Sequence, residues 1–210
     1  MNHQREFGTP GASLSGDSFY DKRKRADVGA SGERRTADLL RALQQRRHPA
    51  NQFAVIHDVM LPSDRYTANI DHIVIAGKTV MIIDSKVWSS GLYVTFKGKT
   101  YVLHSKKTRT QYNKMIARFE AGDHKTLPMT LNILNEWTRQ HGMNQVIFTN
   151  PLMIVWPPEG KSNPSVRFYT PPGVTTAMTP EVARVRLARS ILDQAPNQQL
   201  LNLFLSLLPG

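Results

Sequence analysis

The chain has 210 residues, no cysteine and a formal net charge of +11, from 27 lysines and arginines against 16 aspartates and glutamates. This length allows one domain with a substantial core and excludes two full-sized enzymatic domains. A disulfide framework is excluded, and the sequence has neither an apolar signal-peptide core nor a stretch near the roughly 20 apolar residues of a membrane span. We therefore expect a cytoplasmic protein. Its charge favours nucleic acid as a partner, with anionic lipid or a merely solubilising surface as alternatives.

Residues 1–28 form the first predicted segment, in which glycine, serine, proline and charged residues follow no apolar period. The segment contains a basic run from Lys22 to Arg25. This composition predicts a flexible basic tail. The run can contact phosphates once other residues position the protein, or it can simply be solvated.

A helix and a meander of strands follow. Ser31 is suited to be an N-cap, and Glu33, Ala37 and Leu40 follow at helical spacing, which predicts a helix up to about Arg47. Extended segments come next, with turns at 76–78 and 97–99. Their ranges are 53–61, 69–75, 79–87, 92–96 and 100–103.

The rest of the chain predicts two helices, a buried strand interrupted at Asn150 and Pro151, and a helical extension. The helices cover 110–120 and 127–141, the strand 145–155, a short extended piece 166–169 and a further helix 180–193. The apolar segment 200–208 predicts a packed or partner-binding helix. We therefore divide the chain into a tail at 1–28, a core at 29–156, and a proline-rich linker with a helical C-terminal extension at 157–210.

Charged residues in two of the apolar strands point to a chemical site. Asp71 shares a strand face with Ile73 and Ile75, and Asp84 and Lys86 lie together on one face of the next strand. A hairpin places these strands side by side, so the two aspartates can approach and repel each other unless a cation lies between them. Oxygen ligands of this kind suit Mg²⁺ or Mn²⁺.

Glu33 adds a third carboxylate, because it lies on the helix stripe that should face the sheet. Lys86 can hold an attacking water or offset charge that develops on a phosphate. The alternative is a plain salt bridge from Lys86 to either aspartate. That pair leaves one aspartate and Glu33 unexplained.

These residues also resemble a known family. Gly32-Glu33, then Asn-Ile-Asp-His-Ile-Val at 69–74, then Ile-Ile-Asp-Ser-Lys at 82–86 with Trp88 and Gly91, are similar to the nuclease-related domain, NERD, of the PD-(D/E)xK nuclease superfamily. The resemblance covers about 29–119. It has Asp84 where the superfamily more often has glutamate.

The resemblance implies an α/β fold with a restriction-endonuclease-like core of helix, β-meander, helix and strand, followed by the helical C-terminal extension. It implies Mg²⁺-dependent phosphodiester cleavage, with metal binding by Glu33, Asp71 and Asp84, and with Lys86 as the catalytic lysine. Gln111 lies where related nucleases place a glutamine that contacts the site.

Three further features have two interpretations each. We expect His72 to be a hydrogen-bonded, half-buried histidine rather than a ligand, and Trp88 to pack rather than stack on a base. A positive stretch follows the proposed site and is either a phosphate track or a solvated surface. Its candidate nucleic-acid contacts are Lys106, Lys107, Arg109 and Lys114.

Two functions follow from these patterns. The first is a Mg²⁺-dependent or Mn²⁺-dependent nuclease acting on DNA, with RNA as a possible substrate. The second is a nucleic-acid-binding or partner-docking module that keeps the fold without turnover. We expect no membrane partner, and the C-terminal helices are available for a homo-oligomer or a protein partner.

Overall fold

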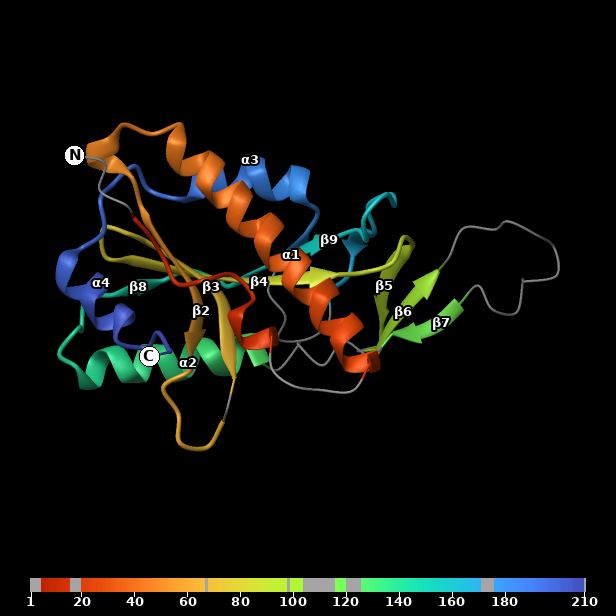
Figure 1. The fold of residues 1–210 in the computed structure, drawn as a ribbon, viewed down its shortest axis with the longest axis horizontal. Helices are drawn as coiled ribbons and strands as arrows, with labels where there is room; N and C mark the ends of the chain where they lie inside the picture. The colour runs from red at the N-terminus through yellow and green to blue at the C-terminus, as the bar shows by residue number, and fades with distance from the viewer. Residues whose placement is uncertain are drawn as a thin grey trace.

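The computed structural model describes residues 5–15, 20–66, 68–97, 99–103, 116–119, 126–170 and 176–209. Within these residues, seven strands form a mixed main sheet in the order β1-β2-β3-β4-β9-β11, with β8 also paired to β4 (Figure 1). The strands are β1 Glu6–Phe7, β2 Ala54–Met60, β3 Asn69–Ala76, β4 Thr79–Val87, β8 Ile147–Phe148, β9 Leu152–Trp156 and β11 Thr176–Met178. The fold is α/β, as predicted.

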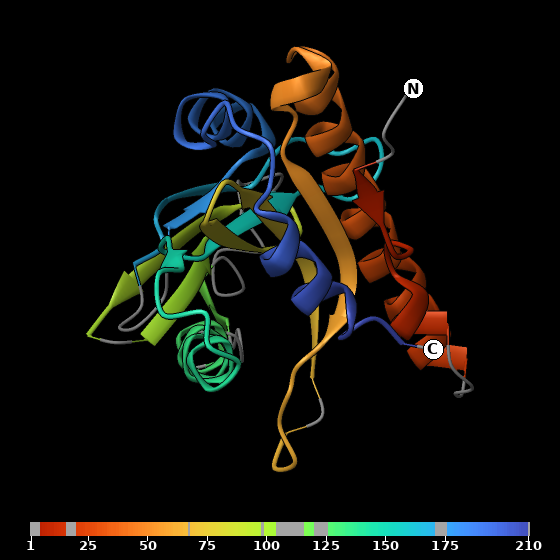
Figure 2. The same cartoon turned by 90° about the vertical axis from the view of Figure 1, so that its left-hand side faces the viewer.

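Helices cover both faces of this sheet. α1 (Tyr20–Gln45) and α3 (Pro180–Ser190) pack on one face, and α2 (Thr126–Gln140) and α4 (Gln198–Leu205) on the other (Figures 1 and 2). The alternation of β3 explains the two layers, because Ile73 belongs to the core under α2 and α4 whereas Val74 belongs to the core under α1. Both cores consist of side chains that are almost fully buried.

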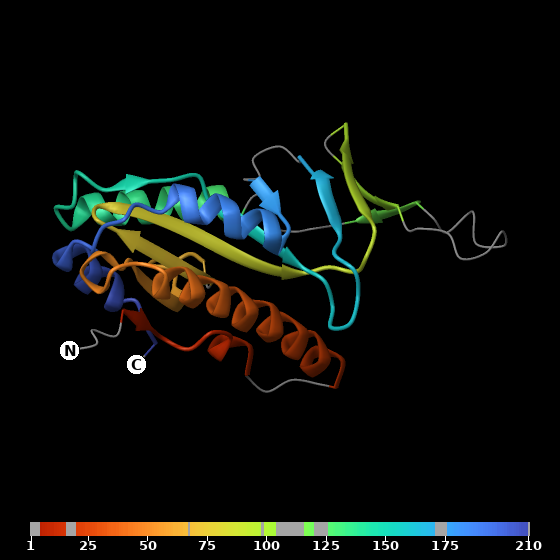
Figure 3. The same ribbon diagram turned by 90° about the horizontal axis from the view of Figure 1, so that it is seen from above.

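A smaller sheet lies at one end of the main sheet, as seen from above in Figure 3. Its order is β10-β5-β6-β7 among the described residues. The strands are β5 Leu92–Phe96, β6 Lys99–Leu103, β7 Ile116–Phe119 and β10 Ser165–Phe168. The predicted hairpin of β5 and β6 is confirmed by antiparallel pairing, with Leu92 opposite Leu103.

One predicted helix is wrong where the structure describes it. Residues 116–119 form strand β7, in which Phe119 lies opposite Thr100 of β6. The sequence Ile-Ala-Arg-Phe suits an edge strand. Pairing with β6 satisfies the backbone hydrogen-bonding groups at the open edge of that strand, and this gain outweighs the weak helical preference of the segment. The remainder of the predicted helix, 110–115 and 120, lies outside the described residues.

The N-terminal prediction also needs correction. α1 begins at Tyr20 rather than at Ser31, and β1 pairs in parallel with β2, with Glu6 beside Val55. The described part of the expected tail therefore belongs to the folded structure. Glu6 is fixed by an ion pair with Arg41 at 2.5 Å, a contact between distant residues that no local pattern indicates.

Most other predicted elements are present. The turn between β3 and β4 contains Gly77 at a φ of 58°, a conformation that glycine adopts at little cost. Asn150 and Pro151 separate β8 from β9 as expected, and α2, α3 and α4 lie where helices were predicted. β11 was not predicted. It pairs with β9, so the chain after residue 176 extends the main sheet.

Among the described helices, none combines the length and the apolar character that crossing a membrane requires.

Candidate active site

β3 and β4 separate at the place where Asp71 and Asp84 lie. The pairing of the two strands ends with His72 opposite Ile83. Beyond this pair, the carboxylate of Asp71 takes the place of a backbone carbonyl as hydrogen-bond acceptor: the Ser85 N–H donates to Asp71 Oδ2 at 2.6 Å. Asp84 directly precedes Ser85, so both aspartates lie where the strands part.

Lys86 makes the ion pair that the sequence left open as an alternative. Its Nζ donates to Asp84 Oδ1 at 2.8 Å, and the two side chains are 28% and 16% exposed. This partial exposure keeps the pair accessible from solvent. The lysine and the aspartate thus share one strand face, as the period of β4 predicted.

Glu33 lies in the same electrostatic environment. The residue is 6% exposed, and its pKa is raised to about 7, first by burial and then by the charge of Asp58. The charge of Asp84 raises this pKa further, while the ammonium of Lys86 and a hydrogen bond from the Gly11 backbone lower it. Mutual effects of this kind decay within several ångströms, so α1 brings Glu33 to the end of the sheet that carries Asp84 and Lys86.

Gly32 explains how α1 comes so close to the sheet. A Cβ at this position would lie 2.8 Å from Val87 Cγ2, nearer than side chains tolerate. The glycine therefore permits the contact between α1 and β4 that brings Glu33 to the site.

Asp58 is a residue that the sequence analysis missed. It is 2% exposed and has a φ of 54°, which is unusual for any residue but glycine. Its two carboxylate oxygens accept hydrogen bonds from Ser13 N at 2.6 Å and from Asn69 Nδ2 at 2.8 Å. The sequence could have indicated Asp58, because it is a lone acidic residue in the apolar segment 53–61. The same kind of pattern identified Asp71.

The segment that contains these residues matches a known family. Residues 28–121 match the family model of the nuclease-related domain, NERD. This segment of the chain is therefore similar to a nuclease-related domain. The matched range includes Glu33, Asp71, Asp84 and Lys86, and it agrees with the range expected from the motifs. No curated protein and no solved structure matches the chain.

His72 and Trp88 both lie inside this NERD segment. His72 is hydrogen-bonded, as expected, but fully buried rather than half-buried, with its Nε2 3.0 Å from Ser85 Oγ. Trp88 is buried, with its ring centroid 4.8 Å from that of Tyr93 and 5.0 Å from that of Tyr169. The expected packing role of Trp88 is confirmed.

Several predicted site residues cannot be placed. Gln111 and the four candidate nucleic-acid contacts Lys106, Lys107, Arg109 and Lys114 lie outside the described residues. Within the part of the chain that the structure describes, no three acidic or histidine side chains form a metal-binding group. Metal binding by Glu33, Asp71 and Asp84 therefore stays a prediction.

Proposed function

We propose that this chain is a metal-dependent nuclease that hydrolyses phosphodiester bonds of DNA. One observation carries the proposal: within a nuclease-related domain, a buried glutamate with a pKa of about 7 is electrostatically coupled to a half-buried aspartate–lysine pair. Such perturbed and mutually coupled groups concentrate at functional sites. A purely structural pair of Asp84 and Lys86 leaves the buried Glu33 without a purpose.

The proposed cofactor is Mg²⁺ or Mn²⁺, with Glu33, Asp71 and Asp84 as the residues that hold it. Their carboxylate oxygens match the preference of these hard cations. The raised pKa of Glu33 supports the fit. It shows that burial and the neighbouring carboxylates make a negative charge on Glu33 unfavourable, and a bound cation would compensate this charge. A divalent cation supplies positive charge against the scissile phosphate.

Lys86 is the proposed catalytic lysine. Its compact ammonium lies at the partly exposed edge of the site, where it can hold a water molecule or stabilise charge developing on a phosphate oxygen. The hydrogen bond from Ser85 N fixes the carboxylate of Asp71 beside β4, so Asp71 keeps its position while Lys86 acts.

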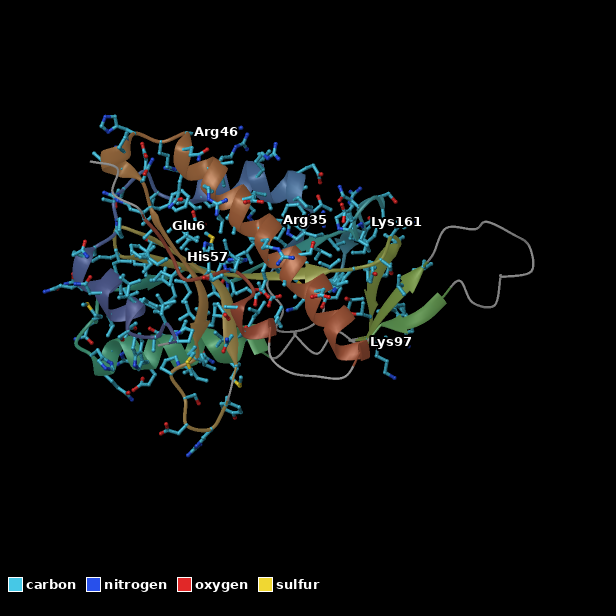
Figure 4. All side chains as sticks on the ribbon, viewed as in Figure 1. Glu6, Arg35, Arg46, His57, Lys97 and Lys161 are labelled. Carbon is cyan, nitrogen blue, oxygen red and sulfur yellow. The ribbon has the colours of Figure 1, made fainter. Side chains whose placement is uncertain are left out.

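A groove between α1 and α3 supports DNA as the substrate, with RNA as the second nucleic acid to test. It has a volume of about 440 Å³, and Arg35, Arg46 and Arg184 line it. Figure 4 labels Arg35 on α1 and Arg46 directly after the C-terminal end of this helix. The groove also contains Asp38 and Glu181.

These two acids do not cancel the positive charge of the groove. Asp38 is paired with Arg41 at 2.6 Å, which does not line the groove, so only Glu181 offsets the charge of the three lining arginines. Trp156, which forms part of the lining, lies opposite Val87 and hence one residue from Lys86 in the register of β4 and β9. The alternation of the strands places Lys86 on the face of Val155, opposite to the face that α1 covers, so the groove meets β4 one residue from Lys86 but on the other face of the sheet. Its guanidinium groups suit phosphate recognition.

The substitution Lys86→Ala tests the proposed function. We expect Mn²⁺-dependent cleavage of linear and circular DNA by the natural chain, its loss in EDTA, and a decrease of roughly a hundredfold or more in the variant. The variant should stay folded and bind DNA within a few-fold of the natural chain. Lys86→Arg should not restore full activity, because a planar guanidinium does not replace an ammonium.

Folding and cleavage should be measured on the same preparations. If Lys86→Ala unfolds more easily but still cuts at the natural rate, Lys86 only neutralises Asp84 and the catalytic assignment is wrong. If the natural chain binds DNA and never cuts it, a binding module is the better account.

A further inference from the structure

A buried series of hydrogen bonds runs behind the proposed site. Glu6 Oε1 lies 3.1 Å from His57 Nε2, and His57 Nδ1 lies 2.7 Å from His72 Nδ1. His72 Nε2 lies 3.0 Å from Ser85 Oγ. The histidines are fully buried and Ser85 is 6% exposed. Figure 4 shows Glu6 and His57 next to each other. The series thus connects β1, β2, β3 and β4.

The series continues from Ser85 into α1. The hydroxyl groups of Ser85 and Thr36 are hydrogen-bonded at 2.8 Å, and the indole N–H of Trp156 donates to Thr36 Oγ1 at 2.8 Å. Thr36 is fully buried. One turn of α1 separates Thr36 from Glu33, so the last links join the helix that carries Glu33 to the strand that carries Asp84 and Lys86.

The chemistry of Glu6 determines the arrangement of protons on the histidines. An ionised carboxylate only accepts, so His57 donates to it through Nε2. The Ser85 hydroxyl donates its proton to Thr36 Oγ1, so its oxygen accepts from His72 Nε2, and the facing Nδ1 atoms of His57 and His72 share one proton between them. Each imidazole therefore uses both of its nitrogens, and Ser85 is bound in one orientation.

This series does not carry protons to the reaction. It ends at the Trp156 indole, which donates and cannot accept, and at Glu6, which is paired with Arg41. Its contribution is geometric. Buried hydroxyl and imidazole groups that lose a partner are unfavourable, so each link holds the elements on its two sides in a fixed relation.

Ser85 is the junction of this arrangement. Its hydroxyl is held by His72 and Thr36 on the α1 side of the sheet, while its backbone N–H donates to Asp71 on the other side. A shift of Ser85 therefore moves the N–H that donates to Asp71, and it moves both flanking residues, Asp84 and Lys86, at the same time.

We infer that Ser85, held by Thr36 and His72, is a positioning residue that fixes Asp71, Asp84 and Lys86 relative to Glu33. The inference rests on the proposed function for its effect on catalysis. Groups that orient active-site residues without touching the substrate typically change activity by ten- to a hundredfold when they are removed.

Thr36 offers a matched pair of variants. Thr36→Val keeps the shape of the side chain and removes the hydroxyl, whereas Thr36→Ser keeps the hydroxyl and removes a methyl group. We expect Thr36→Val to lower kcat for Mn²⁺-dependent DNA cleavage by roughly ten- to a hundredfold at unchanged KM. Thr36→Ser should recover kcat to within a few-fold. A merely structural hydroxyl would change the melting temperature and leave kcat of the folded enzyme unaltered, which would overturn the inference.

A second readout needs no activity. The Ser85 amide proton should resonate far downfield in NMR spectra, because its hydrogen bond to Asp71 is short and charge-assisted. In Thr36→Val this resonance should move upfield and exchange at least about tenfold faster, and in Thr36→Ser it should return. An unchanged Ser85 amide in Thr36→Val overturns the positioning role even in an active enzyme. Conversely, absent cleavage by the natural chain counts against the proposed function alone, because the amide signal still decides the position of Ser85.

Discussion

Glu33 links burial, charge and pH dependence in one side chain. Its pKa of about 7 lies above its ordinary value because burial and the charges of Asp58 and Asp84 disfavour the carboxylate. The folded state therefore binds more protons than the unfolded state between pH 4.5 and 7. Stability is highest below this window, and it falls as the pH rises through the folded pKa.

The substitution Glu33→Gln should remove this loss. In EDTA, we expect the variant to be more stable than the natural chain at pH 8, by roughly 2 to 3 kcal/mol from the size of the pKa shift, and to gain little at pH 4.5. Urea unfolding at the two pH values measures the difference. His57 and His72, whose pKa values burial lowers, titrate with the opposite sign in both proteins and cancel in the comparison. An equal gain at both pH values would contradict the assignment.

Some residues of the candidate site could be identified from the sequence and others could not. Asp71, Asp84 and Lys86 interrupt apolar strands with a period of two, so a local pattern was sufficient. Asp58 interrupts a strand in the same way, but its left-handed backbone removes it from the regular alternation. The bond between His57 and His72 depends on the register of β2 and β3 and on the tautomer of each ring, which no local pattern contains.

At the scale of elements, α1 and β4 approach each other closely at Gly32. Gly32→Ala adds a Cβ 2.8 Å from Val87 Cγ2, next to the backbone of Lys86. Alanine favours the helix by up to about 1 kcal/mol, yet we expect a net loss of roughly 1 to 2 kcal/mol because the helix must move away from a stiff, buried strand. Cleavage should fall as well, since Glu33 moves with the helix.

Gly29→Ala is the control for this prediction, because it lies on the same helix. Its Cβ would meet only the mobile end of Leu14, at 3.0 Å. We expect it to keep activity and to be neutral or slightly stabilising in chemical denaturation. Similar losses in both variants would mean that helix packing at Gly32 has no special role.

The elements that the sequence misassigned share a physical cause. β1 has two residues and β7 four, too few for a periodic signal, and both exist because a partner strand offers an open edge. The early start of α1 likewise depends on tertiary context, because its N-terminal turns are highly charged and lack an apolar stripe. Longer elements such as β4 and α2 were predicted nearly to their ends because their own periods determine which face is buried.

At the scale of the molecule, the net charge of +11 is distributed over several surfaces, and only some of them can bind a nucleic acid productively. The groove between α1 and α3 lies on one face of the main sheet, on the helix that carries Glu33, whereas α2 lies on the opposite face. Arg35 has a structural contact as well, since its guanidinium lies 4.5 Å from the centre of the Trp156 ring and donates to Pro157 O. The exposed Arg46 and Arg184 are therefore the better residues for a test.

Replacing both Arg46 and Arg184 by glutamine should weaken DNA binding and reduce its salt dependence. Each lost phosphate contact lowers the slope of log K against log salt by about 0.9, so two contacts predict a decrease of about 1.8. The matched control replaces Arg65, in the loop between β2 and β3, and Arg139 of α2, which are exposed and remove the same charge elsewhere. Binding of a short duplex in EDTA over a range of salt concentrations separates the two cases. If both double variants change the slope equally, only the total charge of the molecule matters and the groove is not the DNA-binding surface. A decrease confined to the Arg46 and Arg184 variant places the phosphate backbone in the groove between α1 and α3.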